Sequence, residues 1–337
     1  MKPRLKNSVT IVIPTLNREN ALVKTLRRCI KQVYPPELFE IILVNDGEPL
    51  EKFRRLRSFL KKIKDPEIRL IHQNHQGAGS ARNRGAIEGK GEFLCFFDDD
   101  TLPSPFCIKN HVKLLNRTSS IVSQGLILPS PQTSLTDRLI WQDLFPSLLK
   151  HKEDLCFRMI TANLGIKRSF FLKSGLFDPN FKTIEDYELG FRLVKDLNMH
   201  VRFNKYAVVW HESPRDFKSF FSKSLETGKA LLQFFKKHEE KSYLKHSPKP
   251  IKLLPPPLEL KKQFTQLSSK RFTKICSQVT NLEKKYLKTK NPKILREILQ
   301  IYKIFSLYAL GKGFWGSITK SSLLSEQSPT APDNHSS

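Results

Sequence analysis

Short apolar runs alternate with periodic segments over roughly the first 210 residues of the chain. The continuous apolar runs predict buried strands at Val9–Pro14, Phe39–Val44, Ile68–His72 and Glu92–Phe97. Between them, apolar side chains recur every three or four residues and predict helices over Ala21–Val33, Leu50–Ile63 and Gly79–Glu88. Apolar strands that alternate with helices are typical of a mostly parallel sheet covered on both faces. We therefore expect an α/β domain.

The pattern is less regular after the fourth run. Ser104-Pro105 predicts the start of another helix, because a hydroxyl can cap it and proline suits its first position. Residues 134–156 form an insert without clear periodicity. From Thr161 the alternation resumes with an apolar stretch to Ile166, a short helix, a helix over Glu185–Leu197, and two short strands near Val201–Phe203 and Ala207–Trp210.

The composition changes after His211. Apolar side chains between Phe217 and Phe235 form one stripe of an amphipathic helix, and residues 247–257 hold five prolines, which is typical of a linker. We predict an α/β domain, an amphipathic helical segment, a Pro-rich linker, a basic helical extension and a disordered tail, at residues 1–211, 212–246, 247–257, 258–322 and 323–337 respectively.

The charge limits the possible partners of the chain, and the cysteine content limits its possible compartment. Lys and Arg number 58 against 32 Asp and Glu, a formal net charge of +26, which calls for an anionic partner such as a nucleotide phosphate, a nucleic acid or an acidic membrane face. The five cysteines are odd in number and form no C-x-x-C pair, which suits a reducing compartment. No run reaches the roughly 18 apolar residues of a spanning helix. We expect a cytoplasmic protein, with peripheral contact to the inner face of the membrane as an option.

Polar residues gather directly after the predicted strands, where parallel sheets bind ligands. They are Pro14-Thr15-Leu16-Asn17-Arg18, Asn45-Asp46-Gly47, the small-residue loop Gly77–Gly85, and Asp98-Asp99-Asp100. The loop suits a nucleotide phosphate, but Arg82 stands where a dinucleotide fingerprint needs its third glycine, so that fingerprint is excluded. Asp46 taken alone could equally belong to a plain turn between strand and helix.

The three adjacent acids Asp98, Asp99 and Asp100 are the sharpest signal. Their carboxylates repel one another behind a buried strand, and the arrangement is costly unless a cation neutralises it. Hard oxygen ligands of this kind suit Mg²⁺ or Mn²⁺ shared with the phosphates of a substrate. The alternative is a solvated acidic loop at the start of the next helix.

Two later positions carry similar alternatives. Thr183 and Asp186 have the spacing of a capping box, whereas a functional interpretation makes the carboxylate a base that accepts a proton from an attacking hydroxyl. His211 ends a strand, where a lone histidine is usually a packing residue. It becomes a plausible metal ligand only beside the aspartates.

Five pieces of sequence occur in a fixed order over roughly residues 8–211. They are PTLNR, VNDG, HQGAGSARNRGAIEGKGEFLCFFDDDTLPSP, ANLGIKRSFFLKSGLFDPNFKTIEDYELGFRL and VVWH. In this order they resemble the family 2 glycosyltransferases, which have the GT-A fold. The resemblance implies a nucleotide-sugar donor, a Mn²⁺ or Mg²⁺ ion, and a hydroxyl of a glycan or glycolipid as acceptor.

On the donor side, the resemblance implies a role for each matching residue. Those expected to contact the donor are Pro14, Thr15, Asn17, Arg18, Asp46, Arg82, Asp98 and Asp99. Within this set, Asp46 would meet the base and Arg82 would reach the base or a phosphate. Asp98 and Asp100 match the family's D-x-D motif and would hold the cation, with His211 as a third ligand found in some members.

On the acceptor side, Asp186 matches the second residue of the family's E-D pair and would be the catalytic base, with Glu185 beside the acceptor. The family has inverting members, whose single displacement needs only one base. Asn45 departs from the commoner pattern, which has an acid there. The Q-x-x-R-W signature of processive synthases is absent, so transfer of a single sugar is expected.

Two other classes of function remain as alternatives. A nucleotidyltransferase would share the sheet and the metal, but it normally has a glycine-rich loop where Pro14–Arg18 has none. A nucleic-acid-binding protein would explain the charge but leaves Asp98–Asp100 unexplained. The basic C-terminal region is expected either to pack as a helical cap or to dock on an anionic membrane through Ile294–Ile318.

Overall fold

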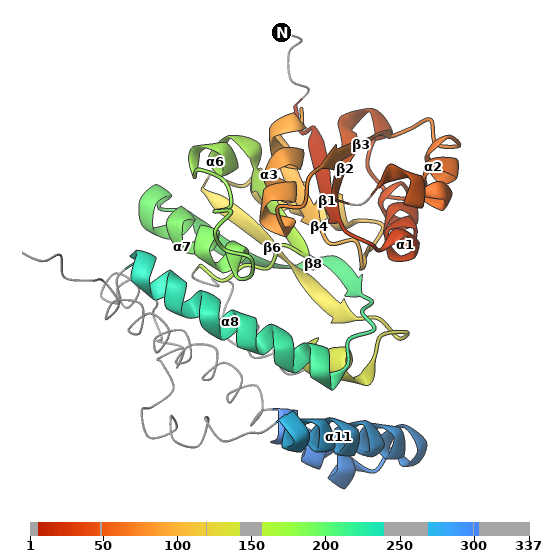
Figure 1. Cartoon of the computed structure of the whole chain (residues 1–337). Coiled ribbons are helices and arrows are strands. Elements are labelled where there is room, and N and C mark those ends of the chain that lie inside the picture. Colours follow the sequence, from red (N-terminus) through yellow and green to blue (C-terminus); the bar gives the residue numbers. More distant parts are fainter. Residues whose placement is uncertain are drawn as a thin grey trace, which may run out of the picture. The chain divides into compact units, whose positions relative to one another are not determined.

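The computed structural model describes residues 6–47, 49–118, 120–141, 157–238, 269–298 and 300–302. They belong to two compact units, which are treated separately (Figure 1). The first unit contains an eight-stranded sheet with helices on both faces and runs to Asp216. The second begins at Phe217 and contains α8 (Phe217–His238) and α11 (Ser269–Thr289).

The sheet is mixed but mostly parallel, in the order β3-β2-β1-β4-β7-β6-β8-β5. Its strands are β1 (Val9–Thr15), β2 (Phe39–Asp46), β3 (Glu67–Gln73), β4 (Phe93–Phe97), β5 (Thr101–Pro103), β6 (Ile121–Pro129), β7 (Asn163–Lys167) and β8 (His200–His211). Strands β3, β2, β1 and β4 run parallel to one another, and β6 runs parallel to β8. Strand β7 runs antiparallel to β4 and β6, and β5 antiparallel to β8.

Two layers of helices explain why the central strands are continuously apolar. One layer consists of α1 (Glu19–Cys29), α2 (Arg54–Leu60) and α4 (Cys107–Leu115), and the other of α3 (Ala78–Glu88), α6 (Arg168–Lys173) and α7 (Glu185–Leu197). Alternate residues of β1 enter opposite cores: Ile11 and Ile13 pack in the first layer's core, and Val12 packs in the second. Every residue of β1, β2 and β4 is therefore buried.

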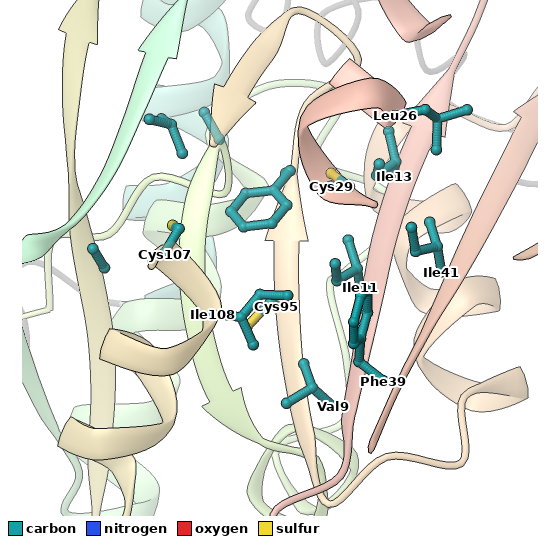
Figure 2. Close-up of a cluster of buried hydrophobic side chains, with 14 of the residues drawn as sticks. Val9, Ile11, Ile13, Leu26, Cys29, Phe39, Ile41, Cys95, Cys107 and Ile108 are labelled. Carbon is teal, nitrogen blue, oxygen red and sulfur yellow. The ribbon is translucent and has the colours of Figure 1, made fainter. Parts of the chain in front are cut away.

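Figure 2 shows the core under the first layer, where β1 and β4 meet α1 and α4. Leu26 and Cys29 of α1 and Cys107 and Ile108 of α4 are fully buried there. Cys95 of β4 lies among them, and all three cysteines carry free thiols. These cysteines therefore serve as small core residues.

Helix α3 approaches the sheet unusually closely on the opposite face. A Cβ built on Gly85 would lie 2.4 Å from Cγ1 of Val12, far inside van der Waals contact. Val12 is fully buried and its β-branched side chain has little freedom to move away. The glycine thus fixes how near α3, and with it Arg82, sits to the strands.

Three features differ from the sequence-based expectations. Helix α4 begins at Cys107, not at Ser104-Pro105, because the Ser104 carbonyl accepts a hydrogen bond from the Cys107 N–H. The two expected short strands are one long strand, β8, with an irregularity opposite Gly125 and Leu126 of β6. Strands β5 and β6 were not predicted at all.

The second unit contains the predicted amphipathic helix. Phe217, Phe221, Leu231 and Phe234 are buried along one side of α8, and the Phe217 ring packs edge-on against Tyr302 at 4.9 Å between centroids. The predicted linker 247–257, the tail 323–337 and most of the segment Ile294–Ile318 lie outside the described residues, so the predicted domain boundaries stay predictions. In the described ranges, no helix combines the length and apolar character needed to cross a membrane.

Candidate active site

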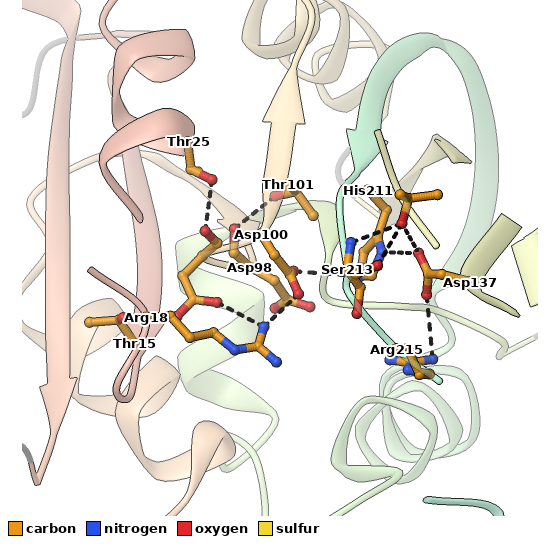
Figure 3. Close-up of polar contacts among 12 residues, drawn as sticks. Thr15, Arg18, Thr25, Asp98, Asp100, Thr101, Asp137, His211, Ser213 and Arg215 are labelled. Atoms are coloured by element: carbon orange, nitrogen blue, oxygen red, sulfur yellow. Dashed lines mark hydrogen bonds and ion pairs between the residues drawn. The ribbon is translucent and has the colours of Figure 1, made fainter. Parts of the chain in front are cut away.

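Three carboxylates follow β4 at the edge where the parallel strands end. The chain turns sharply there, because both the N–H and the hydroxyl of Thr101 donate hydrogen bonds to the Asp98 carbonyl. Strand β5 follows at once and pairs with β8, which places Thr101 opposite His211. The turn thus brings the acids and the histidine to one place, although 111 positions separate Asp100 from His211 in the sequence (Figure 3).

Asp99 is tied to the β1–α1 turn. Its Oδ2 accepts a hydrogen bond from the Thr15 hydroxyl at 2.8 Å, and its carbonyl accepts one from the Thr25 hydroxyl at 2.9 Å. Burial and, after it, the Asp100 carboxylate raise the pKa of Asp99 to about 7, although Arg18 and Thr15 act in the opposite direction. A second carboxylate charge is therefore costly here unless cations are near.

Asp100 lies between a guanidinium and an imidazole, as Figure 3 shows. Its Oδ2 is 2.5 Å from Nη1 of Arg18, and its Oδ1 is 3.5 Å from Nε2 of His211. Arg18 also lies 3.3 Å from Oδ1 of Asp99, but its side chain is half exposed, whereas both acids are buried. Arg18 is therefore the member of this group that is open to solvent.

His211 is oriented by a buried carboxylate that the sequence analysis missed. Oδ2 of Asp137 accepts a hydrogen bond from Nδ1 of His211 at 2.8 Å and another from the Thr133 hydroxyl at 3.0 Å. Because Nδ1 is engaged with Asp137, the other ring nitrogen, Nε2, faces Asp100 (Figure 3). Burial by itself lowers the pKa of His211, but the Asp137 hydrogen bond and the Asp100 charge raise it overall.

Asp100 and His211 supply part of a ligand set for a divalent cation. Within the ranges that the structure describes, no three His, Cys, Asp or Glu side chains are grouped to hold a metal ion by themselves. Asp100 and His211 nevertheless offer a carboxylate and an imidazole that face each other, with Asp137 fixing the imidazole from behind. This set fits an ion that completes its coordination with water and substrate phosphates, as Mg²⁺ and Mn²⁺ do.

Arg82 of α3 joins the acids after β4 to the start of α7. Its side chain is buried, with Nη2 2.6 Å from Oδ1 of Asp98 and Nη1 2.7 Å from Oε1 of Glu185. Burial alone lowers the pKa of Arg82, but the two carboxylates outweigh it and raise the pKa, so the guanidinium stays charged. Its Nε is buried and makes no hydrogen bond within the described residues.

The predicted capping box at α7 is wrong, since Ile184 precedes the helix in a left-handed conformation and no side chain caps it. Asp186 instead accepts hydrogen bonds from the N–H groups of Tyr187 at 2.8 Å and Thr161 at 3.2 Å. Burial raises the pKa of Asp186, and so does the charge of Glu185, while Arg82 opposes both. A carboxylate with a raised pKa is suited to accept a proton near neutral pH.

The comparisons with known proteins agree with this arrangement. Residues 10–175 match the model of the family described as glycosyl transferase family 2. The chain contains a family 2 glycosyltransferase domain.

Curated relatives of the chain are distant in sequence. The probable glycosyltransferase YdaM of Bacillus subtilis (strain 168) is 28% identical over 251 residues, which cover 68% of this chain and 58% of that protein. The putative colanic acid biosynthesis glycosyl transferase WcaA of Escherichia coli (strain K12) is 22% identical over 257 residues, or 70% of this chain and 84% of that protein. The chain thus spans little more than half of the length of YdaM.

Solved structures show the same fold. The mannosyltransferase PcManGT from Pyrobaculum calidifontis, in complex with GDP-Man and Mn²⁺, superposes with a TM-score of 0.61 at 16% identity, over 94% of this chain and 88% of that one. TarS 1–349 from S. aureus, in complex with UDP, gives a TM-score of 0.53 at 12% identity, over 93% and 92%. The expected GT-A fold is confirmed.

The glycosyltransferase domain gathers most of the predicted residues at one edge of its sheet. Their contacts form two groups that meet where Asp98 and Asp99 adjoin in the chain: one of Thr15, Arg18, Asp99, Asp100 and His211, and one of Arg82, Asp98 and Glu185. Pro14 lies within β1, and Asn17 is exposed in the turn after it with a left-handed φ of 58°. Asp186 adjoins Glu185 on α7, so the donor and acceptor sides predicted from the sequence meet at Arg82.

Asp46 has a different set of partners. Its two oxygens accept hydrogen bonds from the side chain of Gln73 and from the backbone N–H groups of Gln76 and Gly77, and they contact Nδ1 of His75. Burial by itself raises the pKa of Asp46, yet these hydrogen bonds hold it below its usual value. The residue therefore clamps the loop that leads into α3, and its contact with a nucleotide base stays a prediction.

Proposed function

We propose that this chain transfers one sugar from a nucleotide-diphosphate donor to a hydroxyl of a glycan or glycolipid acceptor. The observation that carries the proposal is the buried bridge from Asp98 through Arg82 to Glu185. It links acids suited to a metal-bound diphosphate with a carboxylate pair suited to an acceptor hydroxyl. The family 2 match of residues 10–175 supports the same reaction.

On the donor side, Asp98, Asp100 and His211 would hold Mn²⁺ or Mg²⁺. The bound ion would neutralise the charge that develops on the departing nucleoside diphosphate. Arg18 pairs with Asp99 and Asp100 at the mouth of the site, where it can turn to a phosphate. Thr15 and Asn17, with Pro14 and Asp46 behind them, would line the nucleoside end.

On the acceptor side, Asp186 is proposed as the base of an inverting displacement. Its two backbone hydrogen bonds fix the carboxylate, and its partial exposure leaves it reachable by a substrate. It would take the proton of the acceptor hydroxyl as that oxygen attacks the anomeric carbon. Glu185, held by Arg82, would orient the acceptor. One base suffices for a single displacement, and the site offers one fixed carboxylate pair for it.

Calorimetry with two nucleotides and two metals tests the proposal. We expect UDP or GDP to bind more tightly when Mn²⁺ or Mg²⁺ is present, and Asp100→Asn to abolish that gain. Asp186→Asn should keep the metal-coupled binding but stop transfer from the matching nucleotide sugar. Asp196→Asn, an exposed change on the same helix, is the control and should behave as the parent. Nucleotide binding that is absent, or that no metal alters, would contradict the proposal.

A further inference from the structure

The two helical layers of the first unit differ sharply in charge. Helices α1, α2 and α4 together carry eight Lys or Arg and a single acid, Glu19. Helices α3, α6 and α7 on the other face carry six Lys or Arg and five Asp or Glu. The positive charge of the domain is thus concentrated on one face, here called the basic face, which is formed by α1, α2 and α4.

A groove of about 810 Å³ runs between α1 and α2, which lie side by side in Figure 1. Its rim holds Lys24 and Arg27 from α1, Arg54 and Arg55 from α2, and Lys62 just beyond α2; no acid lines it. Its apolar part is made by Val23 and Phe59, and the Arg27 guanidinium lies 5.7 Å from the centre of the Phe59 ring.

A second hollow of about 450 Å³ extends the groove along α1. It adds Arg28 and Lys31 to the cations, and the acid in its lining, Glu212, is already paired with Lys24. Half-exposed apolar side chains lie at the end of this row, since Val33 and Phe106 are each 50% exposed. The Val33 N–H donates to the carbonyl of Pro105, so these two side chains come from adjoining backbone.

We propose that the basic face docks on a membrane surface that is rich in anionic phospholipid headgroups. Cations crowded along a hollow repel one another, and a row of phosphates offsets that cost. The half-exposed Val33 and Phe106 have the character of side chains that enter the interface between headgroups and acyl chains. A free phosphate or a soluble anionic glycan would leave these two apolar side chains in water.

The proposal goes beyond the transfer reaction and does not depend on it. The second hollow reaches the candidate site through Glu212, which directly follows His211. A membrane at the basic face would therefore lie beside the site, where an acceptor anchored in lipid could enter.

Flotation of the full chain on vesicles tests the proposal. We expect binding to phosphatidylcholine vesicles that contain phosphatidylglycerol and none to phosphatidylcholine alone. Arg54→Glu with Lys62→Glu should weaken the binding about tenfold or more, since both cations would face the headgroups. The matched control, Lys173→Glu with Lys195→Glu, changes the charge equally on the opposite layer and should bind as the parent.

A second pair of variants tests the apolar contact. Phe106→Ser should lower binding most at high salt, where charge attraction is screened. Ile87→Ser removes a side chain of similar exposure, 51%, from the opposite layer and should have no effect. Metal-coupled nucleotide binding should be unchanged in all four variants, which keeps this test separate from that of the transfer reaction.

Three outcomes would overturn the proposal. One is equal binding to neutral and anionic vesicles, or none to either. Another is an equal loss in the Arg54/Lys62 variant and its control, which would mean attraction by net charge alone. The third is undiminished binding of the Arg54/Lys62 variant, which would place the contact elsewhere on the chain. Single-stranded RNA that binds the parent but not that variant, with no vesicle binding by either, would assign the face to nucleic acid.

Discussion

The carboxyl group of Asp186 illustrates how the environment of a single residue prepares it for chemistry. Burial and the neighbouring Glu185 charge disfavour its ionised form, whereas Arg82 and two backbone N–H groups favour it. The balance raises its pKa above the usual value near 4 while the proton acceptor stays fixed in place.

The first prediction concerns the pH dependence of transfer. If Asp186 is the base as proposed, it must be ionised to act, so kcat/KM should rise with pH through its raised pKa, well above the range of an ordinary carboxyl group. The pH profile of kcat/KM for the parent measures this directly. An acidic limb near pH 4 would contradict it.

The raised pKa of Asp186 affects stability in the opposite direction: as pH rises, it should make the folded state less stable. A pKa that is higher in the folded state favours folding at low pH, and this contribution is lost as pH rises through the folded-state value. The asparagine of the Asp186→Asn variant cannot ionise, so the variant does not lose stability in this way. The difference between its denaturation midpoint and that of the parent should therefore change in favour of the variant as pH rises from 4 to 8. Asp196→Asn should show no such trend.

Asp137 is the second case at this scale. Asp137→Asn should keep the fold's shape but leave Nδ1 of His211 without a charged acceptor, so the imidazole loses its fixed orientation. We expect Mn²⁺ affinity, measured by electron paramagnetic resonance with a nucleoside diphosphate present, to fall about 10- to 100-fold. Nucleotide binding without metal should not change. Unaltered Mn²⁺ affinity would show that Asp137 only packs.

At the scale of elements, the sequence could predict the buried apolar strands and the site residues that directly follow them. Strands β1, β2 and β4 are buried on both faces, so their apolar runs are unbroken and their positions are evident. Helix α7 was predicted with the bounds that it has, Glu185–Leu197. The acids Asp98–Asp100 follow β4 directly, and so their place at the sheet edge follows from the strand.

Strand β6 was missed because its buried residues are partly polar. Ser123 and Gln124 are buried, and their side chains bond to His111 and to the backbone around Asn163. Burial lowers the pKa of His111 to about 4, so the ring is neutral and serves as a hydrogen-bonding strut. An apolar pattern cannot reveal a strand whose inward side chains are satisfied by partners far along the chain.

The side-chain pairs of the site that the sequence did not predict also join residues that are far apart along the chain. Asp137 meets His211 across 74 positions, and Arg82 meets Glu185 across 103. Neither pair has a fixed spacing, and Asp137 lies in a region without periodicity. Only the folded chain brings these partners together: β6, which precedes Asp137, pairs with β8 and places Pro129 opposite His211, while α3 and α7 lie on one face of the sheet.

The close approach of α3 to β1 leads to a prediction about stability at the scale of elements. Gly85→Ala should destabilise the domain by about 1–3 kcal/mol, because its Cβ would meet the immobile Val12. Chemical denaturation measures the loss. The control is Arg84→Ala on the exposed side of α3, which should cost less than about 0.5 kcal/mol. Equal effects of the two changes would mean that α3 can shift away from the sheet.

For the whole molecule, the contrast between the two helical layers matters more than the net charge of +26. Charge on one side orients the protein at an anionic surface, whereas the same charge spread evenly would not. If the basic face docks as proposed, vesicle binding by the parent should fall several-fold as salt rises from about 0.05 to 0.3 M, because the Debye length shortens. Flotation across that range measures it, and binding indifferent to salt would contradict it.

The guanidinium of Arg82 is shared by the two halves of the site. If the transfer reaction is as proposed, a donor diphosphate that draws this guanidinium toward itself would release Glu185 from its ion pair. Donor binding would then be coupled to the preparation of the acceptor side. An enzyme with this coupling would bind its substrates in a fixed order, with the nucleotide sugar first. It would also hydrolyse that sugar only slowly when no acceptor is bound.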